Sequence, residues 1–156
     1  MNVFQKILLS GTFILVLNQI ALSCVCAGPD SPKEALKYWS DTVFSGEITA
    51  VEILKVDKSK VAVLTFKVEN AWKGVNTKEI VVRDYAFGSD CAPADFKVGE
   101  RYIIFANSKN SRDEPFKDDQ NNPFISIDPC SWTANLANPA AKKKILNKIG
   151  KGKPIK

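Results

Sequence analysis

The 156-residue sequence contains no histidine. Histidine is the usual general base near neutral pH, a member of Ser-His-Asp and Cys-His nucleophilic sites, and the commonest zinc ligand. Its absence excludes a histidine general base, a Ser-His-Asp or Cys-His nucleophilic site, and a zinc site with histidine ligands. Composition leaves open a hydrolase built from carboxylates or lysines, but we expect a protein that is not an enzyme and has no cofactor of its own.

An uninterrupted apolar run of about 20 residues, the length that a membrane helix needs, is also missing. The apolar stretch near the start is short and is broken by Ser10-Gly11-Thr12 and Asn18-Gln19. Lys6 precedes it, and the small residues Ala21 and Ser23 follow it, which is the pattern of a secretory signal peptide. We therefore expect residues 1–23 to be removed, the mature chain to be secreted, and no transmembrane span to remain.

Cysteine is scarce, because the chain has only Cys24, Cys26, Cys91 and Cys130. After a signal peptide, four cysteines imply two disulfides, for which three pairings are possible. Chain ends usually fray, so Cys24-Val25-Cys26 at the cleavage point indicates a terminus that is held rigid and presented. A competing interpretation makes Cys24 the lipid-attachment site of a bacterial lipoprotein anchored at the cell envelope, although Ala21-Leu22 fits that signal poorly.

The remaining chain has the length of one domain, which we place at residues 24–150 with a basic tail at 151–156. The whole chain has a net charge of +5, and lysines concentrate at its C-terminal end, including Lys142-Lys143-Lys144. Such a run could touch nucleic acid or an anionic membrane. For a secreted protein we favour a solvated helix face and a frayed tail, with no nucleic-acid partner.

Apolar periodicity predicts five strands and two short helices. Ser31-Pro32-Lys33-Glu34 is a capping box, and Asn138-Pro139 opens a second helix that Gly150 ends. Ser108–Asn122 has no apolar period and is expected to be a surface loop. The predicted helices lie near Pro32–Ser40, with Ala35, Leu36 and Trp39 on one face, and at Pro139–Ile149; the predicted strands are Val43–Lys55, Val61–Ala71, Glu79–Tyr85, Arg101–Ala106 and Phe124–Ile127.

Five strands flanked by two helices favour a mainly β fold, namely a five-stranded closed barrel of the OB type stapled by disulfides. Closure would also remove the edges that long apolar strands otherwise expose. A Greek-key sandwich is the alternative fold.

The chain contains an ordered set of short motifs: Cys24-x-Cys26, Phe44-Ser45-Gly46, Trp72-Lys73-Gly74, Cys91 before Phe96-Lys97-Val98-Gly99-Glu100-Arg101-Tyr102, and Cys130 after the fifth strand. This set resembles the netrin-like (NTR) domain, in particular the inhibitory domain of tissue inhibitors of metalloproteinases (TIMPs). The resemblance spans about Cys24 to Trp132 and implies an OB-like barrel, the disulfides Cys24–Cys91 and Cys26–Cys130, and inhibition of zinc endopeptidases. One cysteine pair of the six-cysteine TIMP pattern and the separate C-terminal subdomain are absent here.

The resemblance also implies a mechanism and a site. The α-amine and carbonyl oxygen of mature Cys24 would chelate the catalytic zinc of the protease, supplied in trans, and displace the nucleophilic water. Val25 would fill the first primed-side pocket. Ser89 and Asp90 would lie on the unprimed side. Cys26 would hold the segment in place through its disulfide, and Ala27, Gly28 and Pro29 would continue along the primed side. The expected partner is a zinc metalloendopeptidase, bound by a monomer.

Plainer interpretations stand beside this one. Cys24 and Cys26 would then only staple the fold, each bridge contributing roughly 2–4 kcal/mol. Ser89-Asp90 would be an ordinary polar turn, and Asp118-Asp119 would be solvated loop carboxylates. The alternative function is a non-inhibitory NTR-type module that binds a protein or a polyanion, and Trp39, Trp72 and Trp132 are expected to be core or rim aromatics.

Overall fold

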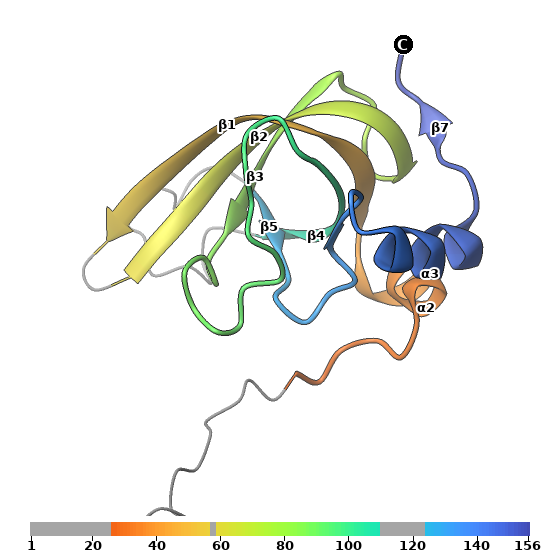
Figure 1. The fold of residues 1–156 in the computed structure, drawn as a ribbon, viewed down its shortest axis with the longest axis horizontal. Helices are drawn as coiled ribbons and strands as arrows, with labels where there is room; N and C mark the ends of the chain where they lie inside the picture. The colour runs from red at the N-terminus through yellow and green to blue at the C-terminus, as the bar shows by residue number, and fades with distance from the viewer. Residues whose placement is uncertain (1–25, 57–58, 110–123) are drawn as a thin grey trace, which may run out of the picture.

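The computed structural model describes residues 26–56, 59–109 and 124–156, and it confirms a mainly β chain with two short helical regions (Figure 1). The predicted signal peptide at residues 1–23 lies outside the described part. No helix within that part is long and apolar enough to cross a membrane. The strands are β1 Thr42–Val56, β2 Ser59–Lys73, β3 Glu79–Asp84, β4 Arg101–Lys109, β5 Phe124–Ile127, β6 Ala134–Asn135 and β7 Lys153–Pro154; the helical segments are α2 Pro32–Glu34, η1 Ala35–Trp39 and α3 Pro139–Ile149.

Five of the strands close into a ring. Strand β1 pairs antiparallel with β2, β2 with β3, β5 with β4, and β4 again with β1, whereas β3 and β5 run parallel. Thr42–Glu47 of β1 pairs with β4, and the far half of β1 extends with β2 as a long hairpin. A sheet closed in this way is not the pair of separate sheets that the sandwich alternative requires.

Gly46 lies in the part of β1 that pairs with both β2 and β4. The β1–β2 register shifts between Ser45 and Gly46, and a Cβ on Gly46 would lie 2.4 Å from the carbonyl oxygen of Lys67. A residue without a side chain therefore lets β1 approach β2 closely at this irregularity.

The apolar run in β4 is buried on both of its faces. Tyr102, Ile104 and Ala106 belong to the cluster inside the ring, together with side chains of β1 and β2. Ile103 and Phe105 point to the other side, where Ala35 of η1 and Ile145 of α3 cover them. Two apolar clusters thus share β4, which explains why its sequence is a continuous apolar run and does not alternate.

The first helical region lies where it was predicted, but its geometry differs. Ser31 caps α2 by accepting from the backbone N–H of Glu34, and η1 is a π-helical turn in which the N–H of Ser40 donates to the carbonyl of Ala35. The wider turn changes the angular spacing of the residues. Ala35 is buried and Trp39 is 45% exposed, so two residues that were predicted to share a helix face differ in burial.

The second helix, α3, is confirmed over Pro139–Ile149, with Asn138 as its N-cap and Gly150 after its last turn. The tail beyond it is not frayed, contrary to expectation. Strand β7 pairs with Asn70 and Ala71 of β2, and the N–H of Ile155 donates to the carbonyl of Glu69. The side chain of Ile155 packs against the core of the ring, which holds the tail in place.

Two further differences concern the end of β4 and the number of strands. Strand β4 continues to Lys109, because Ser108 and Lys109 pair with Ile125 and Phe124 of β5, so the predicted loop at Ser108–Asn122 begins two residues too early. Residues 110–122 of that loop, including Asp118-Asp119, lie outside the described residues. The short strands β6 and β7 were not predicted.

Candidate functional site

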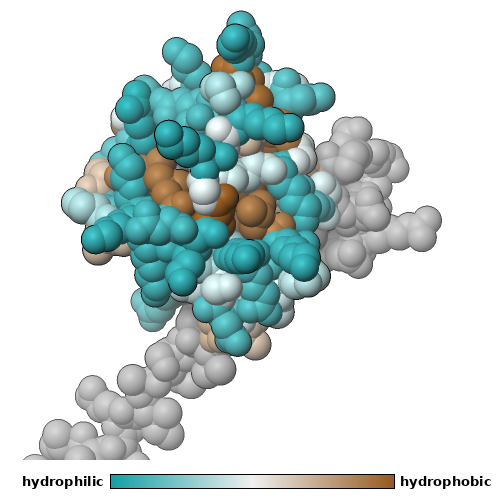
Figure 2. Space-filling model, turned by 90° about the vertical axis from the view of Figure 1, so that its right-hand side faces the viewer, coloured by the Kyte–Doolittle hydropathy of each residue, from teal (hydrophilic) through white to brown (hydrophobic). Residues whose placement is uncertain are grey.

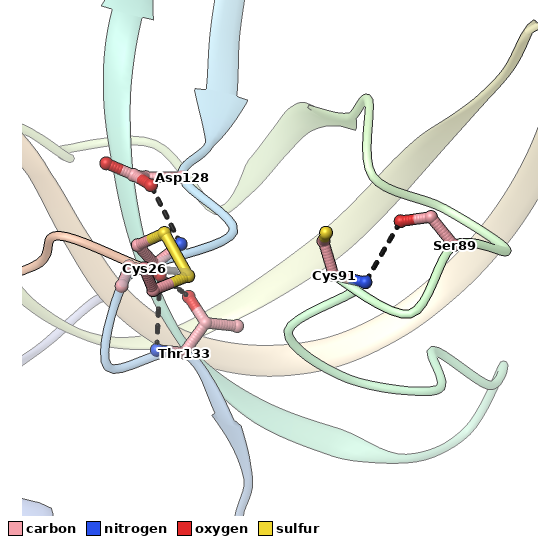
Figure 3. Close-up of a disulfide and its surroundings, with 7 residues drawn as sticks. Cys26, Ser89, Cys91, Asp128 and Thr133 are labelled. Atoms are coloured by element: carbon pink, nitrogen blue, oxygen red, sulfur yellow. Dashed lines mark hydrogen bonds between the residues drawn. A yellow bond between two sulfur atoms is a disulfide. The ribbon is translucent and has the colours of Figure 1, made fainter. Parts of the chain in front are cut away.

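A disulfide anchors the beginning of the described chain at one end of the ring. Cys26 is bonded to Cys130, 104 positions later, with their Cα atoms 5.2 Å apart (Figure 3). This is the pairing that the TIMP resemblance implied. Cys26 and Ala27 are exposed, so the segment from Cys26 to Asp30 is held at the surface and remains accessible.

Gly28 brings this segment directly against its disulfide partner. A Cβ at Gly28 would lie 2.4 Å from the carbonyl oxygen of Cys130, a backbone atom that cannot move aside as a flexible side chain could. The close approach therefore requires glycine. The disulfide and the glycine together fix how closely the segment approaches the turn that carries Cys130.

A second tie follows one residue later. The indole Nε1–H of Trp132 donates to the carbonyl oxygen of Pro29 at 3.0 Å. On the same ring, the Lys144 ammonium lies 4.5 Å from the ring centroid, a cation–π contact from α3. Ser31 then starts α2, so backbone and side-chain contacts hold the segment at both of its ends.

The turn between β5 and β6 carries Cys130 and Trp132, and its own hydrogen bonds hold these two residues in place. Asp128 accepts from the backbone N–H of Cys130 at 2.9 Å, and its own carbonyl accepts from Ser131 at 3.0 Å. The buried Thr133 Oγ1 accepts from the N–H of Phe105 in β4 at 3.0 Å. An Asx-type turn linked to the central strand gives the disulfide a rigid base.

Ser89 organises the loop that follows β3. Its hydroxyl donates to the carbonyl of Ala86 at 2.6 Å and accepts from the N–H of Cys91 at 3.2 Å. Asp84 Oδ1, at the start of the loop, accepts from the N–H of Ala86. Burial raises the pKa of the Asp84 carboxyl, and the Ala86 hydrogen bond opposes that rise. The loop therefore has a defined shape and exposes Ser89 and Asp90.

Tyr102 closes the other side of the same connection. Its hydroxyl lies 2.8 Å from the Asp95 carbonyl and 2.7 Å from Glu100 Oε2, and it accepts from the N–H of Lys97. Burial, reinforced by the Glu100 carboxylate, raises the pKa of Tyr102 to about 12. One buried hydroxyl therefore contacts Asp95, Lys97 and Glu100, which lie between Cys91 and β4.

The predicted site residues fall into two groups. Cys26, Ala27, Gly28 and Pro29 form one continuous segment, whereas Ser89 and Asp90 lie on the loop after β3, at the same end of the ring (Figures 1 and 3). Within the described residues, no hydrogen bond or ion pair joins the two groups. Cys24 and Val25 lie outside the described part.

Cys91 is disulfide-bonded. Because Cys24 is not among the described residues, the Cys24–Cys91 pairing stays a prediction. The sequence reasoning missed two residues that shape the site, Asp128 and Trp132. The only sequence signal for Trp132 is that a partly buried indole N–H needs an acceptor, which does not identify Pro29 as that acceptor.

Searches against protein-family models and against curated proteins found no match for the chain. Among the described residues, no group of three or more Cys, Asp or Glu side chains is arranged to hold a metal ion. The geometry of the N-terminal segment is therefore the basis on which a function can be argued.

Proposed function

We propose that this chain is a secreted inhibitor of zinc metalloendopeptidases that acts through the terminus of the mature protein. The observation that carries the proposal is the Cys26–Cys130 disulfide, which presents an exposed N-terminal segment at one end of the ring. The TIMP resemblance implied the same bridge from motif order alone. A segment ordered before binding loses less conformational entropy in the complex, which favours tight inhibition.

The fold is part of this proposal. The ring order β1-β2-β3-β5-β4, with a parallel β3–β5 pair and antiparallel neighbours elsewhere, supports an OB-type fold of the NTR class. Under this proposal, cleavage after Ser23 makes Cys24 the first residue, and a Cys24–Cys91 bridge ties it to the loop that carries Ser89 and Asp90. The two groups of site residues would then flank one terminus.

The chemistry requires a free α-amine. A catalytic zinc site keeps one open position for water. The amine and carbonyl oxygen of Cys24 would displace that water and bind as a five-membered chelate, which would make the zinc five-coordinate. An α-amine with a pKa of about 7.7–8 has a useful neutral fraction at physiological pH. Val25 would enter the first primed-side pocket, and Ala27, Gly28 and Pro29 would continue along the cleft.

The contacts of Gly28 and Pro29 support this arrangement. The Cα–H side of Gly28 faces the Cys130 carbonyl, and the carbonyl of Pro29 faces the Trp132 indole, so the opposite side of the segment is left for a partner. The segment also lies on a base that is connected to β4 through Thr133, which limits its movement.

The decisive experiment compares the mature protein with a form extended by one alanine before Cys24. Both are assayed against a panel of zinc endopeptidases, after mass spectrometry has confirmed a free Cys24 amine in the first. We expect inhibition by the mature protein only, because the extension turns the amine into an amide with no basic lone pair. Circular dichroism checks that the two forms share the fold.

Equal inhibition by both forms would exclude the chelation mechanism. Inhibition by neither form, or an acylated Cys24 amine, would reject the proposal in favour of a non-inhibitory NTR-type adaptor, in the acylated case one anchored at the envelope. A Val25→Gly variant tests the pocket contact separately from zinc chelation. We expect it to bind the protease more weakly by roughly 1.5–3 kcal/mol, because it empties a side pocket without touching the metal.

A further inference from the structure

The C-terminal part of the chain has a charge distribution of its own. Residues 129–156 contain seven lysines and no aspartate or glutamate, whereas all 17 acidic residues of the chain precede them. Four of the lysines lie on α3 and three on the tail after it. A surface with one sign of charge attracts ligands of the opposite sign.

The structure holds these lysines on a fixed support. The indole Nε1–H of Trp72 donates to the carbonyl of Gly150 at 3.1 Å, and strand β7 pairs with β2. Ile145 of α3 is buried against the ring, and Leu146 packs beside it. The basic segment is therefore part of the fold, and its charges have defined positions.

A groove of about 1060 Å³ runs between α3, the tail and the adjoining ends of β1, β2 and β4. Half-buried Trp72, Leu136 and Leu146 contribute apolar surface to its lining, and exposed Arg101, Lys142 and Lys151 contribute charge. The face that carries α3 and β7 shows apolar atoms surrounded by hydrophilic ones (Figure 2). Glu69 and Glu100 also line the groove, so it is amphipathic, with three cationic and two acidic side chains.

The two acidic residues of the groove have different kinds of partner. Glu69 pairs with Arg101 at 3.0 Å, and Glu100 Oε2 accepts from the Asn135 amide at 2.6 Å and contacts the Tyr102 hydroxyl. Within the described part of the chain, neither Lys142 nor Lys151 forms an ion pair. These two ammonium groups are the positive charges left for an anionic ligand, whereas Glu100 is hydrogen-bonded to neutral groups and keeps its negative charge.

We infer that this groove binds a linear acidic polysaccharide. The C–H faces of sugar rings would lie on the apolar lining, and sulfate or carboxylate groups would pair with Lys142 and Lys151. A bilayer cannot enter a recess, and the apolar side of α3 is already packed against the ring, which disfavours a membrane partner. None of the residues that line the groove belongs to the N-terminal segment or the Ser89 loop, so this inference is independent of the proposed inhibition.

The test is calorimetric titration of the mature protein with a heparin octasaccharide, with a neutral maltooligosaccharide of equal length as the control ligand. We expect binding of the sulfated ligand only. The double variant Lys142→Gln, Lys151→Gln should lower its affinity about tenfold, since two charge-assisted contacts are lost. The matched double variant Lys143→Gln, Lys148→Gln removes the same charge from α3 outside the groove and should lower the affinity at most about threefold.

Equal losses in the two double variants would show diffuse attraction and overturn the groove assignment. Absence of binding, or equal binding of the neutral ligand, would overturn the inference itself. Phosphatidylserine vesicles and duplex DNA serve as comparison probes, and a groove-dependent affinity for either that exceeds the affinity for the octasaccharide would assign the groove to that other polyanion. All four substituted lysines are exposed, so we expect unchanged thermal unfolding in both variants.

Discussion

The indole nitrogen of Trp132 donates a hydrogen bond to the carbonyl oxygen of Pro29, which lies 3.0 Å away and 103 positions earlier in the chain. Together with the Cys26–Cys130 bridge, it ties the N-terminal segment to the turn between β5 and β6 at two points. One tie is covalent and the other is not, so their contributions can be separated by substitution.

Trp132→Phe should loosen the N-terminal segment while the ring stays folded. The variant keeps an aromatic ring beside Lys144 but removes the donor to Pro29, a loss of about 1 kcal/mol. We expect faster amide hydrogen exchange at residues 27–31 and little change in β1 and β4. Trp39→Phe is the matched control, because Trp39 is 45% exposed, and its exchange profile should equal that of the parent protein. Unchanged exchange at residues 27–31 in Trp132→Phe would refute the role of this hydrogen bond.

Gly28→Ala should destabilise the protein by about 1–3 kcal/mol, because the new methyl group would collide with the Cys130 carbonyl. The neighbouring substitution Ala27→Ser falls on an exposed residue and should change the free energy of unfolding by less than about 0.5 kcal/mol. Urea unfolding of both variants with the disulfides intact measures the difference. Equal stability of the two variants would contradict the close approach at Gly28.

Asp84→Asn should stabilise the protein at neutral pH by about 1 kcal/mol or more, since it removes a buried charge. Asp84 is fully buried, and its Oδ2 has no hydrogen-bond partner among the residues that the structure describes. Burial raises its pKa above 3.8, so the folded chain binds more protons than the unfolded chain between 3.8 and the raised pKa. The stability of the parent protein therefore falls as pH rises through that window.

The measurement is urea unfolding of the parent and the Asn variant at several pH values. The advantage of the variant should shrink as the solution is acidified and Asp84 becomes protonated in the parent. An advantage that grows on acidification would show that the carboxylate stabilises the folded chain, which is the opposite of this prediction.

Tyr102→Phe should cost about 1–3 kcal/mol at neutral pH, because Glu100 Oε2 and the N–H of Lys97 lose a buried partner. The parent should also lose stability as pH rises from about 10 to about 12, since the folded chain keeps the Tyr102 proton that the unfolded chain releases. The Phe variant should lack this component. Tyr38→Phe, at a side chain that is 70% exposed, is the control and should behave as the parent does.

The strands could be predicted because their side chains follow burial directly. Val61–Ala71 alternates in sequence, and in the structure Ala62, Leu64, Phe66 and Val68 enter the interior of the ring. The helix caps at Ser31 and Asn138 could also be predicted, since local hydrogen bonds determine each cap. These features depend on near neighbours in the chain.

Features that depend on distant backbone atoms were not predictable. The two-residue strands β6 and β7 are too short to show a period, and β7 forms only because α3 delivers the tail beside Asn70. The need for glycine at position 28 comes from a carbonyl 102 residues away. The Cys26–Cys130 pairing came from the order of motifs and not from residue chemistry, which left three pairings open.

The parallel β3–β5 pair has a consequence for the order of folding. Strands β1 and β2 are joined by two residues and can form a hairpin on a microsecond timescale, about 1–10 μs for simple hairpins. The ring, in contrast, cannot close until β4 returns to β1 and β5 has crossed over to lie alongside β3. Loop entropy must be lost before these distant pairings form, so we expect ring closure to limit the rate. Cys26 and Cys130 approach each other only at that late stage. We therefore expect their disulfide to form after the ring has closed, so that it stabilises the folded chain but does not direct its folding.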